Sequence, residues 1–316
     1  MQAIAIEGFG GRDRLHLMEL DDPLVGPDTV LIENRATSVN PVDWKIREGR
    51  LAGAYPHAFP LIPGWDAAGV VRAVGPAVTA FEPGDEVYAY CRKDFVRDGT
   101  SADLVSMRDA AVARKPQATS FVEAGALPLA GLTALQAIRI LGVGRRDTVL
   151  VHAGAGGVGH LAIQLAKAAG ARVIATAGPD NLDFVRELGA DEAIDYRAGD
   201  VAGAVLERHP DGIDAVLDVF GGEAQAEAAR YLARGRGRLV SIAAPPDDPA
   251  FAERDIDVRY LFVRPDAAGL ATLAAAVDAG RLRVHVSETM PLADTARAHE
   301  LVEGGHTRGK VAISIG

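Results

Sequence analysis

Residues 147–177 of this chain read DTVLVHAGAGGVGHLAIQLAKAAGARVIATA. The stretch opens with a short apolar run, which is typical of a strand buried on both faces of a sheet. A loop with the pattern G-x-G-x-x-G follows, at Gly154, Gly156 and Gly159. Apolar residues at helical spacing come next, and a second apolar run at 172–176 closes the segment. This order of strand, glycine loop, helix and strand predicts a βαβ unit with parallel strands.

Each glycine of that loop has a physical reason to be there. Gly154 permits the tight turn, Gly156 lets the backbone approach a pyrophosphate, and Gly159 lets the helix pack close to the strand. The phosphates would then lie at the positive end of the helix, where amide N–H groups are unpaired. The alternative is a glycine-rich turn without a ligand, but the flanking strands and helix at this spacing favour a dinucleotide site.

Composition and charge narrow the class of protein. The 316 residues carry a formal net charge of −10, which argues against a surface that binds nucleic acid or anionic membranes. One cysteine, Cys91, excludes an intrachain disulfide and fits a reducing compartment, so we expect a cytoplasmic protein. The N-terminus lacks the pattern of a signal peptide, and the apolar stretch 124–143 contains Gln136 and Arg139, so it predicts a core helix rather than a membrane span.

The chain divides into three stretches by pattern. Residues 1–120 alternate short strand patterns with Gly and Pro turn signals, which predicts a β-rich domain. Residues 121–263 alternate strands and helices, and six strand-like segments with helices between them indicate a doubly wound parallel sheet, an α/β fold. Residues 264–316 extend past a complete six-strand sheet, so we expect this tail to return to the first domain.

The end of the second strand bears on the choice of nicotinamide cofactor. NAD-binding proteins carry an acid there, which holds the ribose 2′-hydroxyl. This chain has Thr176-Ala177-Gly178 at that place, and the nearest acid is Asp180. Small and hydroxyl residues leave room for a 2′-phosphate, which favours NADP(H) over NAD(H). The basic partner that a 2′-phosphate usually has is also missing from this segment.

Several short motifs are distributed over nearly the whole chain. They are Asn40-Pro41-Val42-Asp43, Pro63-Gly64-Trp65-Asp66, Pro83-Gly84-Asp85-Glu86-Val87, Leu127-Pro128 with Gly131-Leu132-Thr133-Ala134, and the glycine loop. With Leu188-Gly189-Ala190-Asp191 they make the chain resemble the medium-chain dehydrogenase/reductase superfamily. The resemblance implies a Rossmann domain and a β-rich GroES-like catalytic domain, with the reaction in the cleft between them.

The same motifs resemble the zinc-free branch of that superfamily. Zinc alcohol dehydrogenases carry a Cys where this chain has Asn40, and Gly-His-Glu where it has Gly64-Trp65-Asp66. An indole cannot bind zinc, and an amide is a poor substitute for a thiolate. The chain therefore resembles the quinone oxidoreductase, or zeta-crystallin-like, group of NADPH-dependent reductases, which also includes enoyl reductases. A zinc enzyme with unusual ligands is the disfavoured alternative.

The resemblance implies two candidate catalytic residues. Tyr55 stands where similar reductases carry a Tyr near the substrate, and a phenol is protonated at neutral pH, so it could donate to a developing oxyanion. The alternative is a Tyr that only packs. Asn40 is expected at the N-cap of a short helix, in the nicotinamide pocket, or both. Asp43 and Lys45 are expected to form a solvated surface pair, and Trp65 is expected to pack rather than stack on substrate.

By the same resemblance, the cofactor-binding residues lie at the ends of successive strands. Those expected at the pyrophosphate and nicotinamide are Gly154, Gly156, Gly157, Val158 and Thr133. Those expected at the adenosine ribose and its phosphate are Thr176, Gly178, Asn181 and Tyr196. Ser241, Ala243, Phe262 and Val263 follow late strands, where the crevice of such a sheet binds its ligand. Arg308 in the tail is a candidate for the missing phosphate-binding charge, or else an exposed loop residue.

We therefore expect a zinc-independent NADPH oxidoreductase that transfers hydride to a quinone or an activated enone. Such acceptors are electrophilic enough to take a hydride without a Lewis acid, whereas reaction of an unactivated alcohol or aldehyde would be harder without one. Alternatives are an enoyl reductase of a biosynthetic pathway, or a cofactor-binding protein with little catalysis, similar to a crystallin or an RNA-binding relative. A homodimer is expected by analogy with the family.

Overall fold

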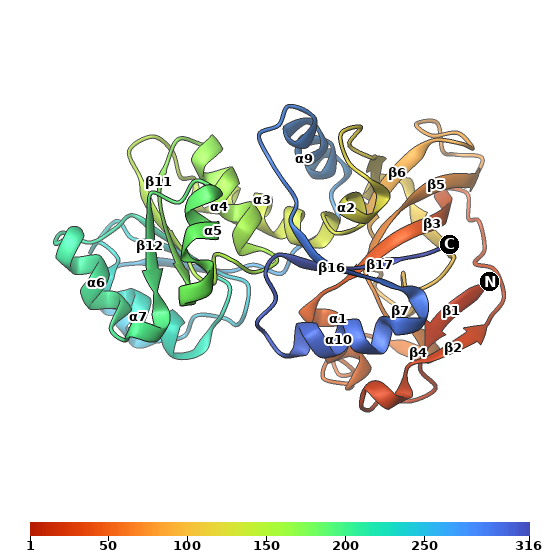
Figure 1. Ribbon diagram of the computed structural model, residues 1–316, viewed down its shortest axis with the longest axis horizontal. Coiled ribbons are helices and arrows are strands. Elements are labelled where there is room, and N and C mark those ends of the chain that lie inside the picture. Colours follow the sequence, from red (N-terminus) through yellow and green to blue (C-terminus); the bar gives the residue numbers. More distant parts are fainter. The chain divides into compact units, whose positions relative to one another are not determined.

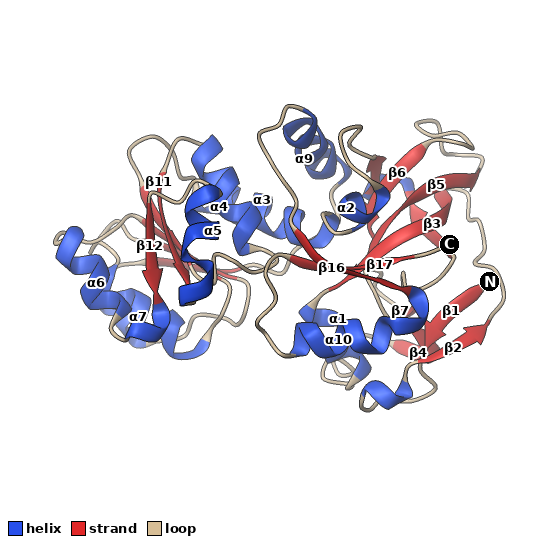
Figure 2. Ribbon diagram, viewed as in Figure 1, coloured by secondary structure: helices blue, strands red, loops and turns tan.

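The computed structural model describes all 316 residues, and they form two compact units. The first unit consists of Met1–Leu132 together with Arg264–Gly316, and the second consists of Thr133–Val263. Figure 1 labels the helices and strands along the chain, and Figure 2 separates helices from strands by colour. The two units are described in turn.

The second unit is built on a six-stranded parallel sheet, in which the strands lie in the order β12-β11-β10-β13-β14-β15. The strands are β10 (Thr148–Val151), β11 (Arg172–Ala177), β12 (Glu192–Asp195), β13 (Ala215–Asp218), β14 (Arg238–Ser241) and β15 (Asp257–Tyr260). The sheet grows outward from β10 in both directions, so the strand order reverses between β10 and β13. This is the doubly wound Rossmann order, and the predicted fold class is confirmed.

Helices connect the strands of this sheet and bury both of its faces. They are α4 (Gly159–Ala168), α5 (Leu182–Glu187), α6 (Val201–Arg208), α7 (Gly222–Tyr231) and α8 (Pro249–Glu253). Leu150 and Val216 pack in one core cluster with residues of α6 and α7. Their neighbours Val149 and Val151 point to the opposite face and are equally inaccessible to solvent. Burial on both faces explains why the strands are nearly continuous apolar runs.

The first unit is built on a seven-stranded sheet with mostly antiparallel pairing. Its strands are β3 (Thr29–Val39), β5 (Asp66–Val74), β6 (Glu86–Tyr90), β8 (Leu104–Arg108), β9 (Val112–Arg114), β16 (Val286–Pro291) and β17 (Lys310–Ser314). Two smaller sheets pair β1 (Gln2–Ala5) with β2 (His16–Glu19), and β4 (His57–Ile62) with β7 (Val96–Asp98). The tail strand β17 lies directly beside β3, with Val311 opposite Val39.

The helices of the first unit come from both ends of the chain. They are α1 (Pro41–Arg47), α2 (Phe121–Gly125), α9 (Ala267–Asp278) and α10 (Thr295–Glu303), and α3 (Pro128–Leu141) contains the unit boundary. The boundary falls after Leu132 rather than at residue 120, because α2 packs on β3 and β5. A Cβ on Gly125 would lie 2.8 Å from the carbonyl oxygen of Ala36, so this helix packs directly against the β3 backbone.

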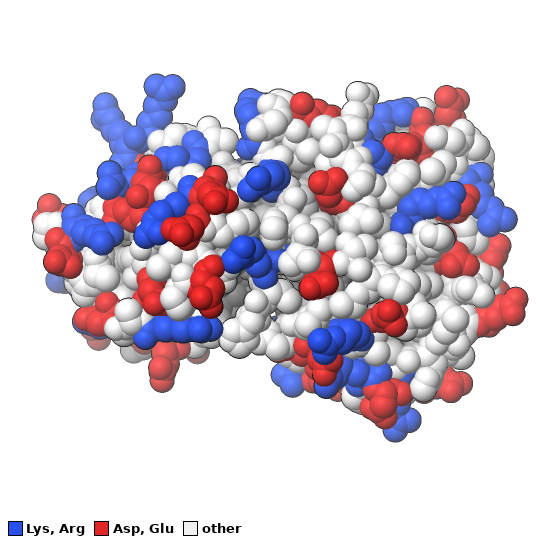
Figure 3. Space-filling model, in the orientation of Figure 1, with Lys and Arg blue, Asp and Glu red and all other residues white.

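Strands β4, β7 and β9 and helix α8 lie outside the predicted elements. They are three to six residues long, and the two strands β4 and β7 pair with each other rather than with the large sheet. Such short elements lack enough residues to show a period. No helix is long and apolar enough to cross a bilayer. On the face drawn in Figure 3, Lys and Arg side chains are interspersed with Asp and Glu.

Candidate functional site

The glycine loop lies between β10 and α4, and its backbone leaves no room for a side chain at Gly154 or Gly159. A Cβ on Gly159 would lie 2.3 Å from the carbonyl oxygen of Ala153. A Cβ on Gly154 would lie 2.9 Å from the Cβ of Ala175 on the neighbouring strand. Ala153 has a φ of 45°, an uncommon conformation for a residue with a side chain. The loop is therefore a tight backbone cradle held against the sheet.

The cradle fits the pyrophosphate of a dinucleotide. Helix α4 begins directly behind it, and its N-cap residue Val158 provides no side-chain cap. The N–H groups of His160 and Leu161 in its first turn already donate to the carbonyl oxygens of Gly156 and Val158, so an anion at this end would depend on the N–H groups of the loop before them. His160 is buried in the first turn, with Nδ1 2.9 Å from the carbonyl oxygen of Gly156, so it lies behind the loop. Gly157 lies in the same loop.

The residues expected around the adenosine ribose gather at the ends of β11 and β12. Thr176 accepts a hydrogen bond at its hydroxyl from the Ala153 N–H, at 3.1 Å, which ties β11 to the glycine loop. Gly178 and Asn181 follow β11 in a single 3₁₀ turn, and Tyr196 follows β12 with about half of its surface exposed. Adjacent parallel strands bring these turns to one edge of the sheet.

Arg197 is the residue that the sequence prediction missed at this edge. Its guanidinium lies over Gly178, so that a Cβ on this glycine would be 3.6 Å from Cζ of Arg197. A hydrogen bond to the Tyr196 hydroxyl raises the pKa of Arg197. A basic residue thus stands at this edge of the sheet in the turn after the third strand, not at the end of the second strand itself. The signal was present as Asp195-Tyr196-Arg197 directly after a strand.

A buried polar network holds the loops after β13 and β14. The carboxylate of Asp218 accepts hydrogen bonds from Ser241 at 2.7 Å and from Gln225 at 2.9 Å, and it lies 3.1 Å from Nδ1 of His152. Although burial opposes ionisation, hydrogen bonds from His152, the Gly221 N–H and Ser241 hold the pKa of Asp218 well below its usual range.

This network uses the Ser241 hydroxyl within the protein. Ser241 has no exposed surface, and its hydroxyl also accepts a hydrogen bond from the N–H of Ala243 at 3.2 Å. Ser241 therefore shapes the loop that carries Ala243. Phe262 and Val263 follow β15, with Phe262 partly exposed and Val263 buried, and Thr133 is buried in α3.

In the first unit, Tyr55 lies in a cluster of aromatic rings. Its ring centroid is 6.2 Å from that of Trp65, which in turn is 6.1 Å from that of Tyr90. Trp65 is almost fully buried and packs as expected. Tyr55 also lines a small apolar cavity together with Phe9 and other residues. The ring is thus held at the edge of a packed cluster.

Arg308 also belongs to the first unit, in the turn before β17. Burial, and then the charges of Arg308 and Arg283, lower the pKa of His285. The role of Arg308 toward a phosphate stays a prediction.

Asn40 is placed as expected at the N-cap of α1, but its side chain does not serve as a simple cap. Its carboxamide nitrogen donates to Asp66 Oδ2 at 2.7 Å, and its carboxamide oxygen accepts from the ammonium of Lys310. Asp66 is completely buried and also accepts from Ser38 Oγ at 2.6 Å and from the Leu129 N–H at 2.6 Å. Asn40 is therefore the centre of a buried charged cluster.

The expected surface pair of Asp43 and Lys45 is wrong. Asp43 is buried, and its Oδ2 accepts from the backbone N–H of Asn40 at 2.7 Å. Its other carboxylate oxygen is buried without a hydrogen-bond partner. Burial raises the pKa of Asp43 to about 7. The N-cap position explains the error, because a residue three places into a helix can turn back onto the N-cap backbone.

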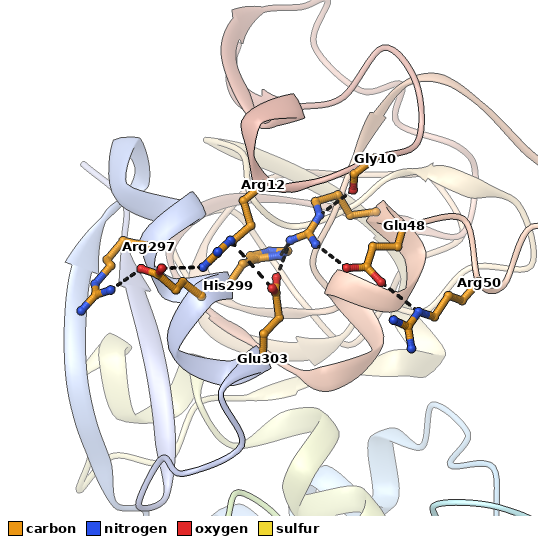
Figure 4. A network of polar contacts seen from close by, with 9 residues as sticks. Gly10, Arg12, Glu48, Arg50, Arg297, His299 and Glu303 are labelled. Atoms are coloured by element: carbon orange, nitrogen blue, oxygen red, sulfur yellow. Dashed lines mark hydrogen bonds and ion pairs between the residues drawn. The ribbon is translucent and has the colours of Figure 1, made fainter.

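The far end of α1 is anchored by a second polar network, drawn in Figure 4. Arg47 is buried and donates to Glu303 at 2.6 Å, to Glu48 at 3.0 Å and to the carbonyl oxygen of Gly10 at 3.1 Å. It also lies 3.2 Å from Nδ1 of His299. Burial and the neighbouring arginine charges lower the pKa of His299 to about 3, so its neutral ring accepts from Arg47. Helix α1, and with it Asn40, is thereby fixed to α10.

The residues near Asn40 do not fit a catalytic zinc ion. No three His, Cys, Asp or Glu side chains lie close enough together to share a metal ion. Trp65 has no metal-binding atom, and the oxygen of Asn40 is used by an ammonium group. Lys310 Nζ also lies 3.7 Å from Asp66, so a zinc ion there would stand beside a cation.

Comparison with known proteins agrees with the architecture of the two units. Residues 188–313 match a family model described as zinc-binding dehydrogenase, and residues 26–117 match the alcohol dehydrogenase GroES-like domain. The chain is 34% identical to the chloroplast envelope quinone oxidoreductase homolog of Arabidopsis thaliana, over 99% of this chain and 98% of that protein. It is 33% identical to an NADPH-dependent alkenal/one oxidoreductase of the same plant, over 99% and 79%.

A solved structure leads to the same family. The chain superposes on the quinone oxidoreductase of Escherichia coli complexed with NADPH with a TM-score of 0.89 and 27% identity, over 99% of this chain and all of the other. The chain therefore belongs to the quinone oxidoreductase family of the medium-chain dehydrogenase/reductase superfamily, a family of NAD(P)H-dependent oxidoreductases.

Proposed function

We propose that this protein reduces quinones or α,β-unsaturated carbonyl compounds with NADPH and without a catalytic metal. One observation carries the proposal: a buried ammonium, that of Lys310, lies beside Asp66 and Asn40, where the zinc branch binds its metal. Without a Lewis acid, hydride transfer requires an acceptor that is already electrophilic. Quinones and conjugated enones meet this requirement, whereas unactivated aldehydes do not.

The choice of NADPH over NADH rests on Arg197. A guanidinium is always charged and binds phosphate through two parallel N–H groups. Over Gly178, it stands at the strand end where an NAD enzyme carries its acid. The chain has no acid at positions 176–178 to repel a 2′-phosphate. Thr176, Asn181 and Tyr196 are proposed to complete this subsite, and Arg308 is proposed as a secondary contact.

When bound, NADPH supplies a hydride, and the reduced acceptor then takes one proton. The chain's own residues bind and orient the cofactor and donate hydrogen bonds to the acceptor. The glycine cradle and the N-terminus of α4 hold the pyrophosphate, and Gly157, Val158, Thr133, Ala243, Phe262 and Val263 are proposed to line the rest of the cofactor. Tyr55 and Asn40 are proposed to donate hydrogen bonds to the oxygen on which charge develops.

The names of two relatives support both acceptor classes, since one is called a quinone oxidoreductase homolog and the other an alkenal/one oxidoreductase. A direct assay follows NADPH oxidation with a panel of quinones and a panel of enones. Each acceptor is also assayed with NADH in place of NADPH. We expect turnover with at least one panel, and prior dialysis against a zinc chelator should not change the rate. Absence of turnover with every acceptor would contradict the proposal.

The cofactor part is tested by Arg197→Ala. Loss of one charged phosphate contact is worth about 1.5–3 kcal/mol, so KM for NADPH should rise roughly 10- to 100-fold while KM for NADH stays the same. Arg186→Ala is the matched control, because Arg186 forms an exposed ion pair with Asp183 on α5. If both cofactors lose affinity equally in Arg197→Ala, the 2′-phosphate role is wrong.

A homodimer and a cytoplasmic location complete the proposal. β15 is an end strand of the parallel sheet, so one of its edges carries unpaired backbone groups that a second copy could pair. Light scattering after size exclusion measures the mass directly. A species of the monomer mass, 33.1 kDa, at micromolar concentration would contradict the dimer.

A further inference from the structure

The ammonium of Lys310 is buried in the first unit with only 3% of the residue's surface exposed. Nζ donates to the carboxamide oxygen of Asn40 and to the carbonyl oxygen of Val39 at 3.3 Å. It lies 3.7 Å from Asp66 Oδ2. Lys310 is the first residue of β17. Val39 and Asn40, which accept its hydrogen bonds, lie at the end of β3 and directly after it, so the pairing of these two strands delivers the charge to Asn40.

Burying this charge does not by itself stabilise the fold. Removing an ammonium from water costs several kcal/mol, and an ion pair in the interior often does no better than apolar residues of the same size. Burial lowers the pKa of Lys310, while Asp66 and then Asp43 raise it, in agreement with that cost. A role other than stability is therefore needed to explain an ammonium at this place.

The chemistry of the neighbours determines how the Asn40 carboxamide points. An ammonium has only donors, so the group facing it must be the carboxamide oxygen. The carboxylate of Asp66 has only acceptors, so the group facing it must be the NH₂. The oxygen and nitrogen ends of a carboxamide are nearly equivalent in shape. The two charged side chains therefore hold the Asn40 carboxamide in a single orientation.

This arrangement leaves one N–H of Asn40 weakly used. One of the two carboxamide N–H groups donates to Asp66 at 2.7 Å. The other has only the Ser38 carbonyl oxygen at 3.5 Å, which is long for a hydrogen bond. An amide whose oxygen accepts from a cation is polarised, and its N–H groups become stronger donors.

We propose that Lys310 is a positioning residue for the reduction: its buried ammonium fixes and polarises the Asn40 carboxamide, so that the second N–H can donate to the acceptor oxygen. This inference rests on the proposed reductase function, in which Asn40 is the donor and Lys310 acts through it. The contact replaces the positive charge of a metal with that of a side chain.

The test is a double-mutant cycle between Lys310→Met and Asn40→Ala, with kcat and KM for the acceptor and the dissociation constant for NADPH as readouts. Misplacing or losing a donor of this kind costs about 100-fold in rate, so each single variant should lower kcat by roughly that factor. The double variant should be no slower than Asn40→Ala alone. The dissociation constant for NADPH should change by no more than about threefold, which corresponds to about 0.6 kcal/mol, because neither side chain is proposed to contact the phosphates.

Folding is controlled separately, because Lys310→Met leaves the Asp66 charge unpaired. The same cycle is measured in the Asp66→Asn background, in which Lys310→Met no longer leaves the Asp66 carboxylate without its cation and only the neighbouring Asp43 carboxyl loses the ammonium. Lys45→Met is the matched control, since Lys45 lies on α1 outside the cluster and should not change kcat. Thermal unfolding of every variant shows whether loss of rate simply follows loss of folded protein.

The outcomes separate the two levels of the proposal. An inactive wild type with quinones and enones would overturn the reductase function and with it the role of Lys310. An active wild type with Lys310→Met at near-normal kcat, or with additive losses in the double variant, would overturn only the role of Lys310. So would a kcat that falls strictly with the folded fraction in both backgrounds.

Discussion

The glycine loop of the second unit and the charged cluster of the first unit use opposite means to prepare a site. The loop at Gly154–Gly159 works through backbone groups that are contiguous in sequence. The cluster works through side chains, and Lys310 and Asn40 are 270 residues apart along the chain. In the loop the important property is the absence of side chains, whereas in the cluster it is the pairing of buried charges.

The difference teaches which kinds of change each site tolerates. The cradle fails when an atom is added at Gly159, because the atoms that a Cβ there would meet are backbone atoms that cannot move independently. A charged cluster fails when a partner is removed, because the remaining charge has no solvent. Additions should therefore damage the second unit and deletions the first.

The largest effect on cofactor binding is expected from Gly159→Val. A Cβ there would lie 2.3 Å from the carbonyl oxygen of Ala153, so the loop must open. An overpacking cost of about 3 kcal/mol corresponds to a loss of NADPH affinity of roughly 100-fold or more, measured by fluorescence titration. Gly8→Ala is the control, since nothing lies within 4 Å of a Cβ at Gly8. Unchanged NADPH affinity in Gly159→Val would contradict the claim that the glycine loop cannot accept an added side chain.

The next effect is expected from Asp66→Leu. It removes the carboxylate beside Lys310 and leaves a buried ammonium, so the free energy of unfolding in urea should fall by about 3–5 kcal/mol. Asp183→Ala breaks the exposed pair with Arg186 and should cost less than about 1 kcal/mol. Equal losses in the two variants would show that the cluster is not electrostatically special.

A smaller effect concerns pH and Asp43. An unfolded Asp releases its proton near its ordinary pKa of 3.8, whereas the folded protein holds this one until about pH 7. Between these values the unfolded state binds fewer protons, so the free energy of unfolding should fall as pH rises from 4 to 7, by roughly 2–4 kcal/mol. Asp43→Asn should flatten that decline and raise stability at pH 8. A wild-type profile as flat as that of the variant would contradict the burial of this carboxyl.

The smallest effect is expected from Tyr55→Phe. Water can supply the proton in place of the phenol, and one neutral hydrogen bond is worth about 1 kcal/mol, so kcat should fall less than about tenfold. Tyr90→Phe is the matched control, because the Tyr90 hydroxyl is buried without a hydrogen-bond partner. It should leave kcat unchanged and raise the melting temperature slightly. A loss well above tenfold in Tyr55→Phe would make Tyr55 the principal donor instead of Asn40.

Much of the fold follows from local pattern. Apart from the short helix α8, the strands and helices of the second unit alternate as predicted over residues 147–263, because each is an apolar run or a helical period followed by a turn signal. The predicted cofactor residues after β10, β11, β12 and β14 share one edge of the sheet, because the carboxyl ends of parallel strands lie at the same edge. Arg197 escaped prediction because an exposed arginine beside Tyr196 resembles any surface charge until β12 is placed next to β11.

The sequence by itself determined the Rossmann unit, the dinucleotide loop and the lack of zinc ligands, since these depend on residue types at short, regular spacings. Only the tertiary structure decided that Asp43 is buried, that Arg197 covers Gly178 and that Lys310 reaches Asn40. The physical reason is that burial and pairing of charge depend on which distant strands become neighbours. The pairing of β17 with β3 is a property of the whole fold rather than of either strand.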